Sequence, residues 1–247
     1  MASTIRKRIR LAALLLIMAM PAIAQWEDSV LYNAYLKNEM TTWNQYLHAN
    51  SFARMSQEEQ IRYLSYEYGY VATAIDEKAP DAKEHIDAFE AHINLLEPVL
   101  PPAQVLVYRS SLAAYHALYN KFFFISKGIE SYNLVKQAYE IDSLDPIVLT
   151  LKGNVDMHAP KALKGDPKRA LKAFELAKKL YEDNGLTMYN WNYISNWLCI
   201  AQCYEKMGNL LRAIRTCEAI LYAEPGFDYV RNVYLPELQA KYDKPKP

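Results

Sequence analysis

Two histidines are the first residues in the sequence whose type and spacing suggest chemistry. His85 and His92 lie seven residues apart, which is two turns of a helix, and Glu84 precedes the first of them. Imidazole nitrogens and carboxylate oxygens bind zinc, but a zinc site normally needs three or four such ligands. No cysteine and no third histidine lies nearby in the sequence. The sequence therefore predicts a pair of surface histidines, with no metal site and no cofactor.

The cysteines are the second candidates for chemistry. Cys199, Cys203 and Cys217 are the only cysteines of the chain, and all three lie in one segment. An exported protein held together by disulfides carries more cysteines, spread along its length. No histidine accompanies Cys199 and Cys203, so they do not complete a metal site. We expect buried apolar cysteines, and a disulfide between Cys203 and Cys217 is the alternative.

The run Phe122-Phe123-Phe124 is the most unusual apolar feature of the sequence. On a helix, each ring would point about 100° away from the preceding one, so three rings cover more than half of the circumference. Packing between helices is the expected role, and an aromatic ring exposed in a groove is the alternative. Most of the twenty tyrosines should also pack helices, and a few are candidates for a surface that binds sugars or peptides.

Sequence signatures of catalysis are absent. The chain contains no G-x-S-x-G, no H-E-x-x-H, no G-x-x-x-x-G-K-[ST] and no G-x-G-x-x-G motif, and its seven glycines stand singly. The 28 basic residues are balanced by 28 acidic ones, whereas a surface that follows a nucleic-acid backbone needs an excess of Lys and Arg. We therefore predict a protein that is not an enzyme and does not bind nucleic acid.

Residues 1–24 have the pattern of a secretory signal peptide. Four basic residues precede an apolar stretch, and Ala22-Ile23-Ala24 supplies a small-x-small cleavage site before Gln25. The apolar run over residues 11–23 is shorter than the ~20 residues that span a membrane. We expect cleavage after Ala24 and a periplasmic or secreted protein without an integral membrane segment; an uncleaved anchor is the alternative. No cysteine lies at the cleavage site, which argues against a lipoprotein.

Helical periodicity dominates the sequence after the predicted signal peptide. Apolar residues recur three and four positions apart, while the alternation typical of strands is absent. The clearest expected helices cover Ala103–Ile125, Glu130–Ile141, Pro167–Tyr181, Asn190–Met207 and Leu210–Tyr222. The sequence therefore predicts an all-α fold, with a single domain over residues 25–241 and a disordered tail over residues 242–247.

A helix–turn–helix pattern is most regular over residues 194–227. Its first helix carries Trp197, Ile200, Ala201 and Tyr204 in the order W-x2-L-G-x2-Y. Gly208 makes the turn, Ala213 lets the second helix approach the first, and Pro225 ends the second helix. This unit resembles the tetratricopeptide repeat, a helix pair of ~34 residues.

The same register recurs upstream of this unit. One pair places Tyr115, Leu118, Tyr119 and Phe122 opposite Ser131, Val135 and Ala138, and the next places Leu149 and Gly153 opposite Ala170, Phe174 and Ala177. Insertions are expected over residues 157–164 and 183–189. Two degenerate units are expected over residues 31–47 and 66–89. A capping helix over residues 227–241, kinked or divided near Pro236, completes the predicted chain.

The resemblance implies a right-handed superhelical solenoid of antiparallel helix pairs, with about three clear and two degenerate repeats. The form of the repeats looks like that of exported tetratricopeptide-repeat proteins of Gram-negative bacteria. In that wider family the repeat is a scaffold for protein interactions, so the resemblance implies a non-catalytic protein that binds a protein or peptide in its concave groove. A small-ligand-binding accessory of an envelope uptake system is the alternative, and an enzyme built on an α/α toroid is a third possibility.

The repeat register also predicts which side chains would line such a groove. One position round from the packing face lie His116, Asn120 and Phe123 on the first clear unit, Asn154 and Met157 on the second, and Gln202 and Lys206 on the third. Asn120, Asn154 and Gln202 would form a ladder of amides able to pair with a peptide backbone. His116 or Lys206 would meet a carboxylate. The alternative is that these residues are simply solvated.

Overall fold

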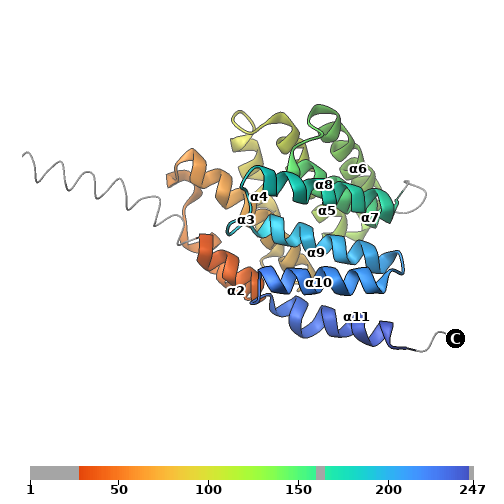
Figure 1. Ribbon diagram of the computed structural model, residues 1–247. Helices are drawn as coiled ribbons and strands as arrows, with labels where there is room; N and C mark the ends of the chain where they lie inside the picture. Colours follow the sequence, from red (N-terminus) through yellow and green to blue (C-terminus); the bar gives the residue numbers. More distant parts are fainter. Residues whose placement is uncertain (1–27, 160–164, 245–247) are drawn as a thin grey trace, which may run out of the picture.

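A computed structural model of the protein describes residues 28–159 and 165–244 (Figure 1). Helices and short turns account for these residues, and no strand occurs among them. A helix over residues 28–36 comes first. It is followed by α2 (Met40–Ala49), α3 (Gln57–Asp76), α4 (Ala82–Leu96), α5 (Pro102–Tyr119), α6 (Phe124–Ile141), α7 (Pro146–His158), α8 (Pro167–Asp183), α9 (Trp191–Lys206), α10 (Leu210–Ala223) and α11 (Leu235–Tyr242). The predicted all-α class is confirmed, whereas the predicted signal peptide lies outside the described residues.

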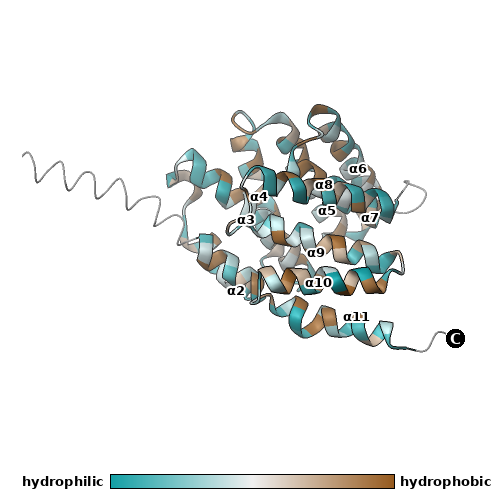
Figure 2. Ribbon diagram, in the orientation of Figure 1, coloured by the Kyte–Doolittle hydropathy of each residue, from teal (hydrophilic) through white to brown (hydrophobic). Residues whose placement is uncertain are grey.

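Neighbouring helices pack as consecutive pairs, α3 with α4, α5 with α6, α7 with α8 and α9 with α10. The helices α10 and α11 each bury one face and leave the other to solvent, so hydrophobic and hydrophilic bands alternate along them in Figure 2. The predicted helices over residues 167–181, 190–207 and 210–222 agree with α8, α9 and α10 to within two residues at each end. The expectation of paired helices is confirmed.

Small residues allow the paired helices to approach closely. A Cβ atom added at Gly153 would lie 2.6 Å from the ring of Phe174, so α7 carries glycine where α8 crosses it. Six of the expected repeat positions are fully buried: Ala138, Ala170, Phe174, Ala177, Ala201 and Ala213. Trp197 and Tyr204 are half-buried, and Pro225 follows the end of α10. Gly208 has φ +76° in the turn before α10, a conformation that favours glycine.

The helix predicted over Ala103–Ile125 is interrupted, and that prediction is wrong. The helix α5 ends at Tyr119, and the Oδ1 of Asn120 accepts a hydrogen bond of 3.0 Å from the backbone N–H of Phe122. A 3-10 turn, η2 (Lys121–Phe123), then leads into α6. Asparagine favours this geometry because its side chain competes with the helix for backbone hydrogen bonds. Leu118, Tyr119 and Phe122, which were expected on a packing face, are consequently exposed.

Aromatic side chains join the beginning of the described chain to its C-terminal helices. The ring of Trp43 lies 5.3 Å from that of Trp191, and Tyr35 lies 5.7 Å from Phe227. Trp191 also donates a hydrogen bond of 3.2 Å from Nε1 to the Oγ of Ser65. The earliest helices therefore pack against the start of α9 and the segment that follows α10, although they are far apart in sequence (Figure 1).

The C-terminal helix is divided near Pro236, as the sequence predicts. A π-helical turn, η4 (Val230–Tyr234), precedes α11, in which Pro236 is one of the first residues. Proline has no N–H to donate, and a π-helical turn accommodates the missing hydrogen bond. Val230 and Leu238 are buried, which places this helix against α10. Of the predicted tail, residues 245–247 lie outside the described residues.

Candidate functional site

The residues of the predicted amide ladder lie in different surroundings. Asn120 is used as the cap between α5 and α6. Asn154 on α7 is half-buried, with its Oδ1 3.8 Å from the Sγ of Cys199 on α9. Gln202 is also half-buried. Of the three amides, the structure therefore engages Asn120 and Asn154 within the protein.

The other predicted groove residues are divided between the core and the surface. Met157 is buried, with its Sδ 3.4 Å from the Sγ of Cys203, so it does not line an open surface. Lys206 donates from Nζ to the backbone oxygen of Met157, near the end of α7. His116 is half-buried and Phe123 is exposed.

The three cysteines are free thiols. Cys203 and Cys217 are buried, and Cys199 is half-buried. Burial raises the pKa of each thiol to about 12, so all three are protonated at neutral pH. The expectation of buried apolar cysteines is confirmed for Cys203 and Cys217.

An exposed apolar surface surrounds the junction of α5 and α6. We call it the apolar turn, and it consists of Leu118, Tyr119, Phe122, Phe123, Phe124, Ile125 and Ile129. Phe122 is 88% exposed, and its ring meets that of Phe123 edge to face at 5.3 Å. Core packing was the expected role of the three phenylalanines, and that prediction is wrong. The sequence signal for the turn is Asn120, which stops α5 before the aromatic run.

Positive charge accompanies the apolar turn. Residues 98–129 contain no Asp or Glu but include Arg109, Lys121 and Lys127. Lys121 is exposed within the turn, and Lys127 pairs with Glu130 at 2.7 Å. Arg109 pairs with Glu97 at 2.7 Å, so Lys121 is the cation that this surface presents beside its exposed aromatic rings.

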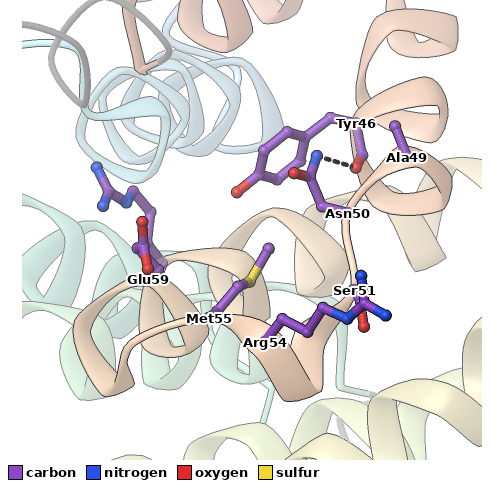
Figure 3. Close-up of a pocket in the computed structure, with 8 residues that line it drawn as sticks. Tyr46, Ala49, Asn50, Ser51, Arg54, Met55 and Glu59 are labelled. Atoms are coloured by element: carbon purple, nitrogen blue, oxygen red, sulfur yellow. Dashed lines mark hydrogen bonds between the residues drawn. The ribbon is translucent and has the colours of Figure 1, made fainter.

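A shallow hollow of about 310 Å³ lies where α2 meets α3 (Figure 3). It is lined by Tyr46, Ala49, Asn50, Ser51, Arg54, Met55, Glu59 and Arg62. Arg62 pairs with Asp28 at 3.2 Å, and Glu59 completes a capping box with Ser56. Arg54 is exposed and makes no ion pair with the described residues. The hollow therefore presents one available guanidinium group.

His92 near the C-terminal end of α4 is a structural residue. Its Nδ1 lies 2.9 and 3.1 Å from the two carboxylate oxygens of Glu67, which is 1% exposed. The imidazole also stacks on Phe52, with ring centroids 3.8 Å apart. Burial raises the pKa of Glu67, and the hydrogen bond from His92 opposes that shift. The ring is therefore held by a hydrogen bond to a buried carboxylate and by an aromatic stack.

His85 in the first turns of α4 lies in a different environment, where its Nε2 is buried and makes no hydrogen bond. That atom faces the Oδ2 of Asp81 at 3.5 Å, and the Nε2 of His48 on α2 lies 3.7 Å from the same oxygen. The ligand atoms of these three residues lie within 4.8 Å of one another. His85 is 5% exposed, so the prediction of a surface pair of histidines is wrong.

The surroundings shift the pKa values of His85 and Asp81. Burial lowers the pKa of His85 in spite of the neighbouring carboxylate, so its ring is neutral at neutral pH. Partial burial tends to raise the pKa of Asp81. Backbone and side-chain hydrogen bonds, together with the neighbouring His85, outweigh this effect and lower the pKa. One of those hydrogen bonds comes from the Asn44 side chain. Two imidazoles and one carboxylate therefore converge on one point.

No family model matches the chain, and no curated protein matches it either. Among the described residues, no helix combines the length and the apolar character needed to cross a membrane.

Proposed function

We propose that the chain is an exported, non-catalytic scaffold of the tetratricopeptide-repeat type that binds a protein partner. The observation that carries this proposal is the apolar turn, where seven large apolar side chains are exposed at the junction of one helix pair. Contiguous apolar surface of this kind marks interaction sites on monomeric proteins. The buried register positions Ala170, Phe174 and Ala213 support the repeat type and, with it, a right-handed superhelix.

The geometry of the turn favours protein recognition. Phe122 and Phe123 project from a short 3-10 turn that is fixed at both ends by helices. Rings held in this way lose little conformational freedom on binding, and exposed aromatic residues are typical anchors of interfaces. Because Lys121 is exposed beside these rings, a partner with an apolar pocket and a carboxylate at its rim is the best match. This position replaces the concave groove as the expected contact surface.

Capture from an envelope extract tests the proposal. The variant Phe122→Ser/Phe123→Ser removes two anchors, and Tyr222→Ser is its matched control because Tyr222 is 91% exposed on α10, away from the turn. We expect the wild type and the control to enrich the same protein, and the double variant to lose at least about 90% of it, since aromatic anchors contribute about 2 kcal/mol or more each. Equal enrichment by a folded double variant would contradict the proposal.

A second variant separates the apolar turn from the predicted groove. Asn154→Ala/Gln202→Ala truncates two half-buried amides without touching the turn. We expect this variant to capture the partner as well as the wild type does. Loss of capture only in this variant would mean that the partner binds the predicted groove on α7 and α9 and not the apolar turn.

Export is part of the proposal and has its own test. The cleavage site after Ala24 predicts a mature chain that begins at Gln25. Intact-mass measurement of the protein from an envelope fraction distinguishes this chain from the full-length one. A full-length mass in that fraction would contradict cleavage.

The hollow beside α2 supports a second candidate function, the binding of a small anionic ligand. Arg54 provides a guanidinium group, and Tyr46 and Asn50 line the same hollow (Figure 3). Native mass spectrometry of the protein from its source would reveal a bound molecule. If that molecule occupies the hollow, Arg54→Ala removes it while Phe122→Ser/Phe123→Ser retains it.

A further inference from the structure

We propose that His48, Asp81 and His85 form a binding site for a late first-row divalent cation, with Zn²⁺ as the reference ion. The site is independent of the proposed partner surface, because it joins α2 to the start of α4. Its three ligands would be Nε2 of His48, a carboxylate oxygen of Asp81 and Nε2 of His85.

The first support is a buried imidazole nitrogen with no hydrogen bond. The Nε2 of His85 is such an atom, and its residue is among the few polar ones buried within the described chain. Buried polar atoms are nearly always paired, so an exception needs an explanation. This nitrogen points at the Asp81 carboxylate from 3.5 Å, at the outer limit of hydrogen-bonding distance. A cation between the two groups would satisfy both.

The second support is the spacing of the ligand atoms. Around a tetrahedral zinc ion with bonds of about 2.0–2.1 Å, neighbouring ligand atoms are ~3.4 Å apart. The Oδ2 of Asp81 lies 3.5 Å from the Nε2 of His85 and 3.7 Å from that of His48. All three ligand atoms lie within 4.8 Å of one another, so a rotation of the exposed His48 side chain would bring both imidazoles and the carboxylate around one ion.

The surroundings hold the ligands in place and leave an entry path. The ring of Tyr70 meets that of His85 edge to face at 4.8 Å, and the Asn44 side chain hydrogen-bonds to Asp81. Partners of this kind orient metal ligands. The side chain of His48 is 52% exposed, so the ion can enter from solvent and a water molecule can take the fourth position.

The ligand types determine the class of metal. Imidazole nitrogen suits zinc, copper and nickel, whereas magnesium and calcium prefer sites made only of oxygen. Two imidazoles and one carboxylate therefore favour Zn²⁺ strongly over Mg²⁺. Because His48 and Asp81 come from different elements, bound metal would fasten α2 to the N-terminal end of α4.

Titration of the metal-free full chain with Zn²⁺ by calorimetry tests the site. We expect one Zn²⁺ per chain and no heat from Mg²⁺ under the same conditions. His48→Ala and Asp81→Asn should each weaken Zn²⁺ binding by at least ~100-fold, since each removes one of only three protein ligands. His48 is exposed enough for its variant to fold, and His116→Ala on α5 is the matched control that should bind as the wild type does.

Substitution with Co²⁺ identifies the donor atoms. We expect the visible bands of a nitrogen- and oxygen-ligated tetrahedral ion, without the near-ultraviolet charge-transfer band that a thiolate would add. Failure of the wild type to bind Zn²⁺ would overturn the proposal. So would unchanged binding by both ligand variants, or a thiolate band, which would place the ion at the cysteines.

Discussion

The two ends of α4 each carry a histidine, and the contrast between them separates a structural imidazole from a candidate ligand. His92 has a buried carboxylate within hydrogen-bonding distance and a phenyl ring stacked on its face. His85 is more deeply buried, yet its Nε2 has no hydrogen bond. Burial alone therefore does not assign a role to a histidine. What distinguishes the two is whether the protein satisfies the ring nitrogens by itself.

The largest loss of stability is expected from a substitution of His92, the histidine whose ring nitrogen is hydrogen-bonded. His92→Phe keeps a ring to stack on Phe52 but leaves Glu67 buried without its partner. Removal of one member of a buried pair costs about 3 kcal/mol or more, so the melting temperature should fall by about 6–12 °C. Urea unfolding monitored by circular dichroism measures the loss. The double variant Glu67→Leu/His92→Phe should recover at least half of it, and a lack of recovery would mean that the contact between Glu67 and His92 is not the cause.

The same pair predicts a pH dependence of stability. Burial raises the pKa of Glu67 above its unfolded value, so the folded chain holds that proton more tightly than the unfolded chain does. The stability contributed in this way is complete below the unfolded pKa and is lost as the pH rises through the folded pKa. His92 opposes the shift, and Tyr63 is the other titratable group beside Glu67.

Without His92, the pKa of Glu67 should be raised further. The destabilisation caused by His92→Phe should therefore increase by about 1–2 kcal/mol between pH 5 and pH 8. Urea titrations of both proteins at the two pH values measure this difference. A constant difference would show that Glu67 does not change its protonation in this range.

A smaller effect, on metal binding, is expected from a substitution of Asn44, whose side chain contacts the cluster around His85. Asn44→Ala removes the amide that hydrogen-bonds to Asp81 but keeps all three proposed ligands. Loss of such a supporting hydrogen bond typically weakens metal binding about tenfold, equivalent to about 1.4 kcal/mol. Asn50→Ala, at the residue that follows α2, is the control, and zinc titration of both variants should separate them.

The smallest effect on stability is expected from a substitution of His85 in the metal-free protein. His85→Phe substitutes an apolar ring of similar shape for one with an unpaired nitrogen, so the free energy of unfolding should change by less than about 1 kcal/mol. The same substitution at the other end of the helix costs several times more. If His85→Phe is as damaging as His92→Phe in metal-free protein, the two ends do not differ as described.

Local patterns in the sequence were sufficient to predict the helix pairs. Residues such as Ala170, Phe174 and Ala213 recur at fixed spacing, and small residues at helix contacts have a direct steric reason. The break at Asn120 was missed because apolar periodicity continues through it into the phenylalanine run. In the structure, the capping hydrogen bond of one side chain overrides that periodicity.

The histidine cluster could not be predicted from spacing. His48 and His85 lie on different helices, and only the packing of α2 against the segment before α4 brings them together. The sequence instead suggested His85 with His92, which are on one helix. Nothing in their spacing reveals that His92 is already hydrogen-bonded to Glu67 and stacked on Phe52.

The contact between Trp43 and Trp191 has a consequence for how the chain unfolds. In an open array of helix pairs, each pair is held only by its neighbours, so the terminal pairs fray first and unfolding proceeds in steps. Here α9 packs on the earliest helices as well as on α8, and Gly69 lets Trp43 and Trp191 approach closely. The array is thereby joined end to end, and neither end can detach without exposing the aromatic rings of the other. Such an arrangement should melt in one cooperative transition.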